Sequence, residues 1–319
     1  MARASVAGHA AAALLALLVA ACGEATPNPP DAPESGGAGD AEPGAERQTF
    51  EQSFVFAAVS GDSAFFVPWL MRTTAYPDSA VRGTRGWLGR SGTWEAFYDE
   101  EWTTPATRAP SRILPHGSLD LLVEEGDGID GIVFDDGARH LELALGDVEA
   151  AWGGPRGETV ELFDGMAYLA DERLEGFVLH LARASVGDAP PGGDWALLVS
   201  GDSLRLVLSA DVEHGGGTEP LYRGWARLRD EERLWTRVRV DWTAMQAFPP
   251  ARRDVPAGWR IRSAEGMLDG ELAQLAAEIR PGEGPGPLLP VLALFEVTGE
   301  MAIEDGVFPV RGLLVHERR

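Results

Sequence analysis

From residue 48 to the C-terminus, apolar and polar residues alternate in short runs that end at turn residues. Trp195–Val199 and Leu204–Leu208 flank the turn sequence Ser-Gly-Asp-Ser, and Phe295–Ile303 and Val307–Val315 flank Glu-Asp-Gly. Alternation with a period of two around a turn rich in Gly and Asp is typical of β-hairpins. The chain contains roughly a dozen to sixteen such runs. Because no regular helices separate them, the pattern predicts antiparallel sheets, in a barrel or a sandwich, rather than a parallel α/β fold.

One stretch departs from this alternation. Asp269–Arg280 places Leu272, Leu275, Ala276 and Ile279 at the spacing of a helix. A helix and a strand with small residues both fit this segment, and the sequence leaves the two alternatives open.

The segment Leu221–Trp242 is the most regular predicted hairpin, with an acidic turn at residues 230–232. A period of two places aliphatic side chains on one face of both strands and Arg and Trp side chains on the other. Guanidinium groups stack on indole rings and bind carboxylates through two hydrogen bonds, so the Arg/Trp face is a candidate site for an anionic or aromatic ligand. In the alternative, the aliphatic face packs into the core and the Arg/Trp face meets water or acidic side chains. The predicted Arg/Trp face holds Trp225, Arg227, Trp235, Arg237 and Arg239, and the predicted aliphatic face includes Ala226, Leu228, Leu234, Val238 and Val240.

Two histidines on predicted strands are further site candidates. His140 and His180 alternate with leucines, and Glu142 follows His140 on the same strand face. A His–Glu pair inside a barrel transfers protons readily, because imidazole titrates near neutral pH and a carboxylate orients it. The alternative is an exposed polar face on a half-buried strand. Hydrolase and phosphate-binding motifs are absent from the sequence, and no histidines show metal-ligand spacing, so we expect no metal and no cofactor.

The N-terminus has the three parts of a secretory signal. Arg3 precedes the apolar run Ala10–Ala21, which is too short to span a bilayer because spanning needs roughly 20 residues. The following sequence, Val-Ala-Ala-Cys-Gly ending at Gly23, resembles the lipobox of bacterial lipoproteins. The resemblance implies a signal peptide at residues 1–21, lipid on Cys22, and the periplasmic face of the outer membrane, since Gly23 stands where Asp marks inner-membrane retention. An ordinary signal peptide with a chance cysteine is the alternative.

The amino-acid composition supports three further predictions, about a linker, the binding partners and the interior. Residues 22–47 are rich in Pro, Gly, Ala and acids, so we predict a disordered linker behind the lipid anchor. The formal net charge of the chain is −23. Such a charge repels nucleic acid and anionic lipid, so we expect no nucleic-acid partner and membrane contact through the lipid alone. The ten tryptophans fit either an aromatic ligand cavity or two packed cores.

From Trp242 onward the order of motifs resembles the C-terminal half of the hydroxyneurosporene synthase/AttH-like family. The resemblance implies an all-β, antiparallel fold of two lipocalin-like barrels in tandem, here at residues 48–188 and 189–319. A large β-sandwich is the alternative. The family's terminal Gly-Tyr-Val-Glu is replaced by Gly-Leu-Leu-Val, which removes a tyrosine and an acid, so only fold positions are carried over. The resemblance is carried by Gly258-Trp259-Arg260-Ile261, Leu289-Pro290, Glu296-Val297-Thr298-Gly299 and Arg311-Gly312-Leu313-Leu314.

Three functions fit these features. The first is a membrane-tethered lipoprotein that binds an apolar or isoprenoid-like small molecule in a barrel cavity. The second is a hydratase or isomerase of the same fold, which needs an acid or base inside that cavity. The third is a surface β-sandwich that binds glycan or protein. The missing family acids favour binding over catalysis, and a protein partner remains open. An enclosed apolar cavity of several hundred Å³ would distinguish the first two functions from the third.

Overall fold

The computed structural model describes residues 47–61, 63–123, 128–154, 157–187, 193–211 and 221–318. The predicted signal peptide, Cys22 and all but the last residue of the predicted linker lie outside the described residues. Within the described ranges, the structure contains no helix of the length and apolarity that a membrane crossing requires.

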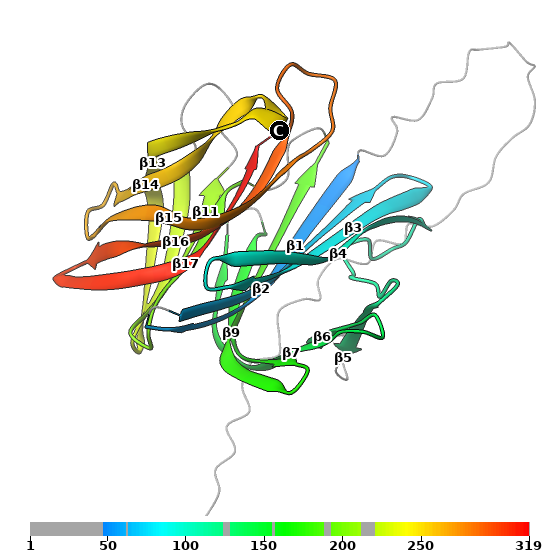
Figure 1. Cartoon of the computed structure of the whole chain (residues 1–319), viewed down its shortest axis with the longest axis horizontal. Helices are drawn as coiled ribbons and strands as arrows, with labels where there is room; N and C mark the ends of the chain where they lie inside the picture. Colours follow the sequence, from blue (N-terminus) through cyan, green and yellow to red (C-terminus); the bar gives the residue numbers. More distant parts are fainter. Residues whose placement is uncertain are drawn as a thin grey trace, which may run out of the picture. The chain divides into compact units, whose positions relative to one another are not determined.

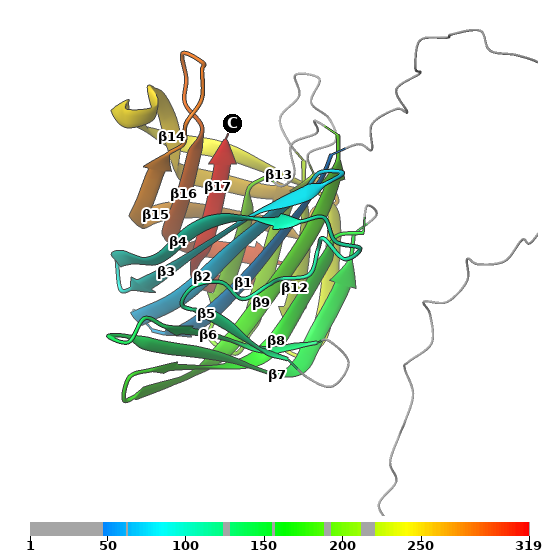
Figure 2. The same cartoon turned by 90° about the vertical axis from the view of Figure 1, so that its right-hand side faces the viewer.

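The first half of the described chain forms one antiparallel sheet of nine strands. The strand order is β4-β3-β2-β1-β9-β8-β7-β6-β5, so the first strand pairs with the last and the free edges are β4 and β5. Figure 2 shows this curved, open sheet in blue to green. Its strands are β1 (Gln48–Ser60), β2 (Ser63–Ala75), β3 (Ser79–Arg90), β4 (Thr93–Pro105), β5 (Leu119–Val123), β6 (Ile129–Asp135), β7 (His140–Gly153), β8 (Thr159–Leu169) and β9 (Glu172–Val186).

The second half forms a closed antiparallel barrel of eight strands in sequence order, in which β10 also pairs with β17 (Figure 1). A single 3₁₀ turn, η2 (Pro249–Ala251), interrupts the strands of the described part of this half. The strands are β10 (Trp195–Ser200), β11 (Leu204–Asp211), β12 (Leu221–Leu228), β13 (Glu231–Phe248), β14 (Arg253–Ser263), β15 (Leu268–Pro281), β16 (Val291–Ile303) and β17 (Gly306–Arg318). The all-β, antiparallel prediction is confirmed, with one closed barrel and one half-barrel in place of a sandwich.

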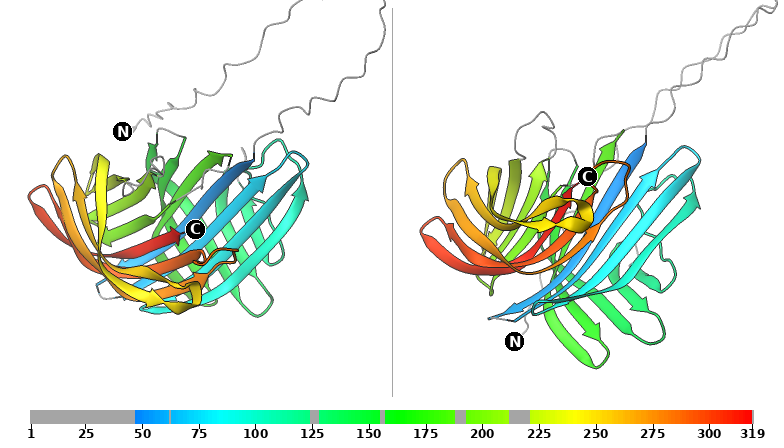
Figure 3. Two further views of the ribbon diagram at one scale, coloured as in Figure 1. Left: turned by 90° about the horizontal axis from the view of Figure 1, so that it is seen from above. Right: turned by 45° about the horizontal axis from the view of Figure 1, so that its top comes forward.

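Buried apolar side chains form three clusters. One fills the barrel interior and includes Trp235, Trp259 and Phe295. A second lies between the nine-stranded sheet and the barrel wall, with Trp87 from the sheet in the same cluster as Trp225 from the barrel. The third covers the other, concave face of the nine-stranded sheet. Figure 3 shows the barrel, in yellow-green to red, beside the sheet. Because the sheet packs on both faces, its strands have apolar side chains pointing both ways.

The helical alternative for Asp269–Arg280 is wrong, because the segment lies within strand β15 and pairs with both β14 and β16. A register shift between Gln274 and Ala276 breaks the alternation of this strand. Leu272 and Ile279 both reach the barrel core, whereas Leu275 is exposed. A β-bulge adds one residue to a strand and so changes its apparent period. The bulge therefore explains why the apolar residues of this strand have the spacing of a helix.

A second bulge corrects the predicted faces of the β12–β13 hairpin. The register shifts between Tyr222 and Gly224, so Gly224 pairs with Trp235 while Tyr222 pairs with Val238. As a result, Trp235 and Val238 both point into the barrel. Leu234, predicted on the aliphatic face, is instead 57% exposed. The Arg/Trp face is therefore not continuous across the hairpin.

This register has a measurable consequence. Trp235→Ala is expected to lower the free energy of unfolding by about 3 kcal/mol, because the indole is only 4% exposed in the barrel core. Leu234→Ala, one residue away, should change it by less than about 0.5 kcal/mol. Urea unfolding followed by circular dichroism measures both values. The reverse ranking would show that the predicted, unbulged register holds instead.

Candidate functional site

The strands β1 and β9 lie side by side and present different chemistry on their two faces. On β1, Ser53 and Val55 point toward the barrel, whereas Phe54 and Phe56 point to the concave face of the sheet. Adjacent residues of a strand point to opposite sides, so each strand lines two separate spaces. One space is a cavity on the concave face of the sheet, here called the concave cavity. The other lies between the sheet and the barrel and is here called the junction pocket.

The concave cavity has a volume of about 590 Å³. This is within the usual range for small-molecule sites. Its lining combines apolar side chains with polar and charged ones, which include Arg112, Asp130, Asp147, Glu161 and His180. Gln52 donates a hydrogen bond to the backbone carbonyl of Ser111 at 2.5 Å. A cavity with apolar walls and several polar groups is suited to a ligand that has an apolar body and also carries hydrogen-bonding groups. The apolar walls are formed by Phe54, Ile113, Leu121, Val123, Ile129, Leu145, Val148 and Phe163.

His180 and Glu161 face each other across β9 and β8, where they are direct cross-strand partners. His180 Nδ1 lies 2.9 Å from Glu161 Oε2. The imidazole stacks on Phe54 with ring centroids 4.3 Å apart and an angle of 11° between the planes. Together the carboxylate and the phenyl ring fix the orientation of the imidazole. His180 Nε2 is buried and has no hydrogen-bond partner among the described residues.

The hydrogen bond from His180 lowers the pKa of Glu161 below its ordinary value, and it outweighs the opposing effect of partial burial. The ionised carboxylate is therefore the form that the folded protein favours. An imidazole that donates through Nδ1 to a carboxylate keeps Nε2 as its second functional nitrogen. The pair thus has the composition of a general-base dyad, although hydrogen-bonded His–Glu pairs also serve structural roles.

Glu161→Gln is expected to lower the free energy of unfolding near pH 7 by less than about 1 kcal/mol, because the side chain is 34% exposed and water screens the pair. The lowered folded-state pKa means that the contribution is present above the ordinary value of 4.5 and is lost as the pH falls through the folded value. Urea unfolding at pH 7 and at about pH 3 measures the difference, with Glu142→Gln as the control. A larger effect in acid would contradict the assignment.

The other predicted site residues do not gather at the concave cavity. His140 is exposed on β7, with Nδ1 3.3 Å from Asp135 and Nε2 4.0 Å from Glu142. This matches the alternative of an exposed polar face. Trp225 is buried between the sheet and the barrel, and Trp235 lies inside the barrel. The structure therefore divides the predicted Arg/Trp face between different environments.

The arginines of that face lie outside both cavities. Arg227 donates to the backbone carbonyl of Glu149 at 2.7 Å, and Arg237 and Arg239 are exposed. This arrangement follows the alternative in which the arginines meet water or acidic neighbours. Of the seven predicted ligand-binding residues, His180 alone lines the concave cavity.

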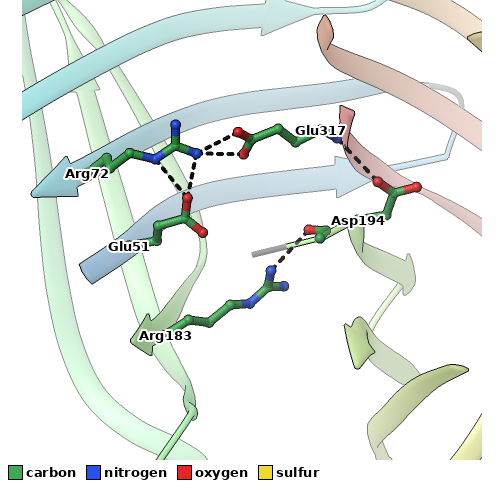
Figure 4. A network of polar contacts seen from close by, with 6 residues as sticks. Glu51, Arg72, Arg183, Asp194 and Glu317 are labelled. Atoms are coloured by element: carbon green, nitrogen blue, oxygen red, sulfur yellow. Dashed lines mark hydrogen bonds and ion pairs between the residues drawn. The ribbon is translucent and has the colours of Figure 1, made fainter. Parts of the chain in front are cut away.

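The junction pocket contains a network of charged side chains from both halves of the described chain (Figure 4). Arg72 Nε donates to Glu51 at 2.8 Å, and its Nη2 donates to Glu317 at 2.6 Å. Burial works to lower the pKa of Arg72, but the charges of Glu317 and Glu51 raise it. The arginine therefore remains a cation between two carboxylates and ties β2 of the sheet to β17 of the barrel.

A second part of this network is more deeply buried. His316 Nδ1 lies 2.8 Å from Asp194, and the hydroxyl of Tyr222 donates to the same carboxylate at 3.3 Å. Burial, and then the charge of Asp194, raise the pKa of Tyr222 well above its ordinary value. The phenol consequently stays neutral and donates a hydrogen bond to the carboxylate. These groups position the start of β10 against the end of β17.

Sequence reasoning missed Glu161, Gln52 and the arginines of the junction pocket. Alternation along residues 48–60 and 177–183 indicates two-faced strands, but it does not say which strands become neighbours. The pairing of β8 with β9 that joins Glu161 to His180 is a hairpin, so it could have been found from the turn at residues 170–171. Contacts such as Arg72–Glu317 join residues far apart in the chain and leave no local signal.

No protein-family model matches this chain, and no curated protein matches it either. Among solved structures, kievitone hydratase from Nectria haematococca is 11% identical, with a TM-score of 0.51 over 86% of this chain and 89% of that chain. A putative AttH from Nitrosomonas europaea is 12% identical, with a TM-score of 0.52 over 85% of this chain and 92% of that chain. These neighbours support the predicted resemblance in fold. At such low identity they say nothing about activity.

Proposed function

We propose that this protein binds an apolar small molecule, isoprenoid-like in character, in the concave cavity. The observation that carries the proposal is a space of about 590 Å³ in which a set of apolar side chains lies beside polar groups that include the His180–Glu161 pair. A ligand with a long apolar body and one hydroxyl group would bury its body against the leucines and phenylalanines and place its hydroxyl near His180. The closed barrel is less suitable, because its interior is occupied by the apolar cluster around Trp235 and Trp259.

Farnesol is a suitable probe because it has this composition. We expect it to bind the full chain in the micromolar range, measured by quenching of tryptophan fluorescence or by calorimetry. Leu121→Trp fills the cavity wall and should weaken binding at least about tenfold, since the ligand and the indole compete for the same volume. Leu234→Trp, on an exposed barrel position, is the matched control and should bind as the wild type does.

Two results would contradict the proposal, each in a different way. Equal farnesol affinity in the wild type, Leu121→Trp and Leu234→Trp would contradict the concave cavity as the binding site. Absence of binding in all three, together with no lipid retained by protein from its own host in native mass spectrometry, would contradict apolar ligand binding altogether. Circular dichroism of each variant verifies that it remains folded.

A second candidate function is hydration or isomerisation of the bound molecule. The His180–Glu161 pair favours it, because it adds a proton-transfer group to an apolar cavity. A fold neighbour carries the name kievitone hydratase, which is compatible with this chemistry. In a hydration, an acid gives a proton to one alkene carbon, the oxygen of a water molecule forms a bond to the other carbon, and that water gives up one of its two protons to a base. Incubation of farnesol in water enriched in oxygen-18 should then give a product heavier by one labelled water, and His180→Gln should abolish it.

The proposal also includes a membrane tether, supported by the N-terminal sequence that ends at Cys22. Lipid on this cysteine would hold the folded part near a membrane that stores apolar molecules. Cys22→Ser should move the protein from the membrane fraction to the soluble fraction of its host. Retention of the variant in the membrane fraction would contradict lipid anchoring.

A further inference from the structure

The junction pocket lies on the opposite face of the sheet from the concave cavity, and the proposed function makes no use of it. We propose that it is a second binding site, which takes a compact zwitterion such as a free amino acid with an aliphatic side chain. Its volume is about 170 Å³, enough for a small molecule but not for the ligand of the concave cavity. The pocket is lined by the buried Arg183, by the Arg72 ion pairs with Glu51 and Glu317, by apolar side chains and by exposed acids of β4.

Arg183 supplies a positive charge to the pocket. It is only 9% exposed, and two of its nitrogens donate to neutral acceptors, the carbonyl of Gly193 at 3.0 Å and the hydroxyl of Ser209 at 2.9 Å. Its Nε is buried without a hydrogen-bond partner, and no carboxylate of the described residues forms an ion pair with it. A buried guanidinium normally has a carboxylate in direct contact. Arg183 is thus a buried cation that lines the pocket without an ion-paired carboxylate, which makes it the natural partner for a carboxylate that comes from outside the chain.

The surroundings of Arg183 favour a zwitterion over a simple anion. Four carboxylates interact electrostatically with Arg183 without contacting it. They belong to Glu51, Glu158, Glu317 and Asp194. Glu51 and Glu317 are held by Arg72, and Asp194 is held by His316. A ligand with net negative charge would be repelled by this group. A ligand that carries its own cation would not change the net charge of the pocket.

An exposed acid of β4 provides the partner for that cation. Glu101 on β4 is exposed, lines the pocket and has no ion-pair partner among the described residues, whereas the side chain of its neighbour Glu100 lies on the face of Tyr98, the concave face. Asp99 also lines the pocket, but it is paired with Arg85 and Arg280. An ammonium group would therefore lie toward Glu101 while the carboxylate points toward Arg183. An aliphatic side chain would pack on the apolar wall, which is formed by Leu70, Leu181, Trp195, Leu292 and Val315.

Calorimetry with three probes of one carbon skeleton tests the proposal on the full chain. L-leucine carries both charges, 4-methylpentanoate lacks the amine, and 3-methylbutylamine lacks the carboxylate. We expect leucine to bind, and each analogue with a single charge to bind at least about tenfold more weakly. Equal binding of leucine and either analogue, or no heat from leucine up to about 10 mM, would overturn the proposal.

Two variants locate the site. Arg183→Met should abolish leucine binding, with Arg237→Met, an exposed arginine, as the control. Since Arg183→Met removes a buried group and the variant could fail to fold, a second variant, Glu101→Gln, changes only an exposed side chain. It should weaken leucine binding and leave 4-methylpentanoate binding unchanged, whereas Glu100→Gln, on the other face of the same strand, should bind leucine as the wild type does. Unchanged leucine affinity in Glu101→Gln would overturn the proposal, whether or not Arg183→Met folds.

Discussion

Replacing Arg311 by methionine is expected to lower the free energy of unfolding by about 4 kcal/mol, the usual cost of leaving one member of a buried ion pair alone. Arg311 Nε donates to Glu296 at 2.8 Å, and the carboxylate is only 1% exposed. The other oxygen of Glu296 accepts the backbone N–H of Gly92 at 2.7 Å. Gly92 lies in the β3–β4 turn of the sheet, so the loss affects both the barrel and its contact with the sheet. Urea unfolding at neutral pH measures the change.

A compensating variant makes this prediction specific. In Glu296→Leu/Arg311→Met, both charges are replaced by apolar side chains of similar size, and we expect most of the lost stability to return. The backbone N–H of Gly92 would then lose one acceptor, so recovery should be incomplete by about 1 kcal/mol. A single variant as stable as the wild type, or a double variant no better than the single, would contradict the role of the pair.

Gly312→Val is expected to destabilise the barrel by about 4–5 kcal/mol or to prevent its closure. A Cβ atom at Gly312 would lie 2.0 Å from the backbone carbonyl oxygen of Leu197. The obstacle is the main chain of β10, which pairs with β17 and closes the barrel. A flexible side chain could move aside, but the carbonyl is fixed by strand pairing, so the strands must separate.

Gly153→Val is the control for this variant. Gly153 ends β7, and a Cβ atom there meets nothing within 4 Å. Its replacement by valine should change stability by less than about 0.5 kcal/mol. Thermal unfolding of both variants, followed by far-ultraviolet circular dichroism, gives the comparison. A stable, native-like Gly312→Val would show that β17 and β10 do not approach as closely as described.

The strands could be predicted from the sequence because each hairpin is local. Alternation and turn residues mark both arms, and the resemblance to AttH-like proteins supplied the arrangement of the halves. The errors arose at two bulges. The bulge between β12 and β13 places Trp235 on the inward face, where Leu234 had been predicted. The bulge in β15 gives Asp269–Arg280 its helical spacing. Gly312, one of the residues that carry the resemblance, is a position where a Cβ atom would meet the main chain of β10.

The cavities could not be predicted, because they depend on which strands remain unpaired. The sheet stays open because its edge strands β4 and β5 do not pair, and β5 has only five residues that could pair with another strand. In the other half, β10 pairs with β17 and closes the barrel. Local periodicity does not encode this difference. His180 was identified because it alternates with leucines on a predicted strand and because an imidazole titrates near neutral pH. Arg72 and Arg183 were not, since their partners come from the other half of the chain.

Photolabelling tests the central claim, that an apolar ligand occupies the concave face of the nine-stranded sheet. A farnesol analogue with a diazirine group on its apolar end is bound to the full chain and irradiated, and peptide mass spectrometry locates the adducts. We expect adducts on residues of the cavity wall such as Ile113, Leu121 and Leu145, and we expect these adducts to disappear when excess farnesol competes. Competable adducts confined to the strands of the barrel would contradict this claim.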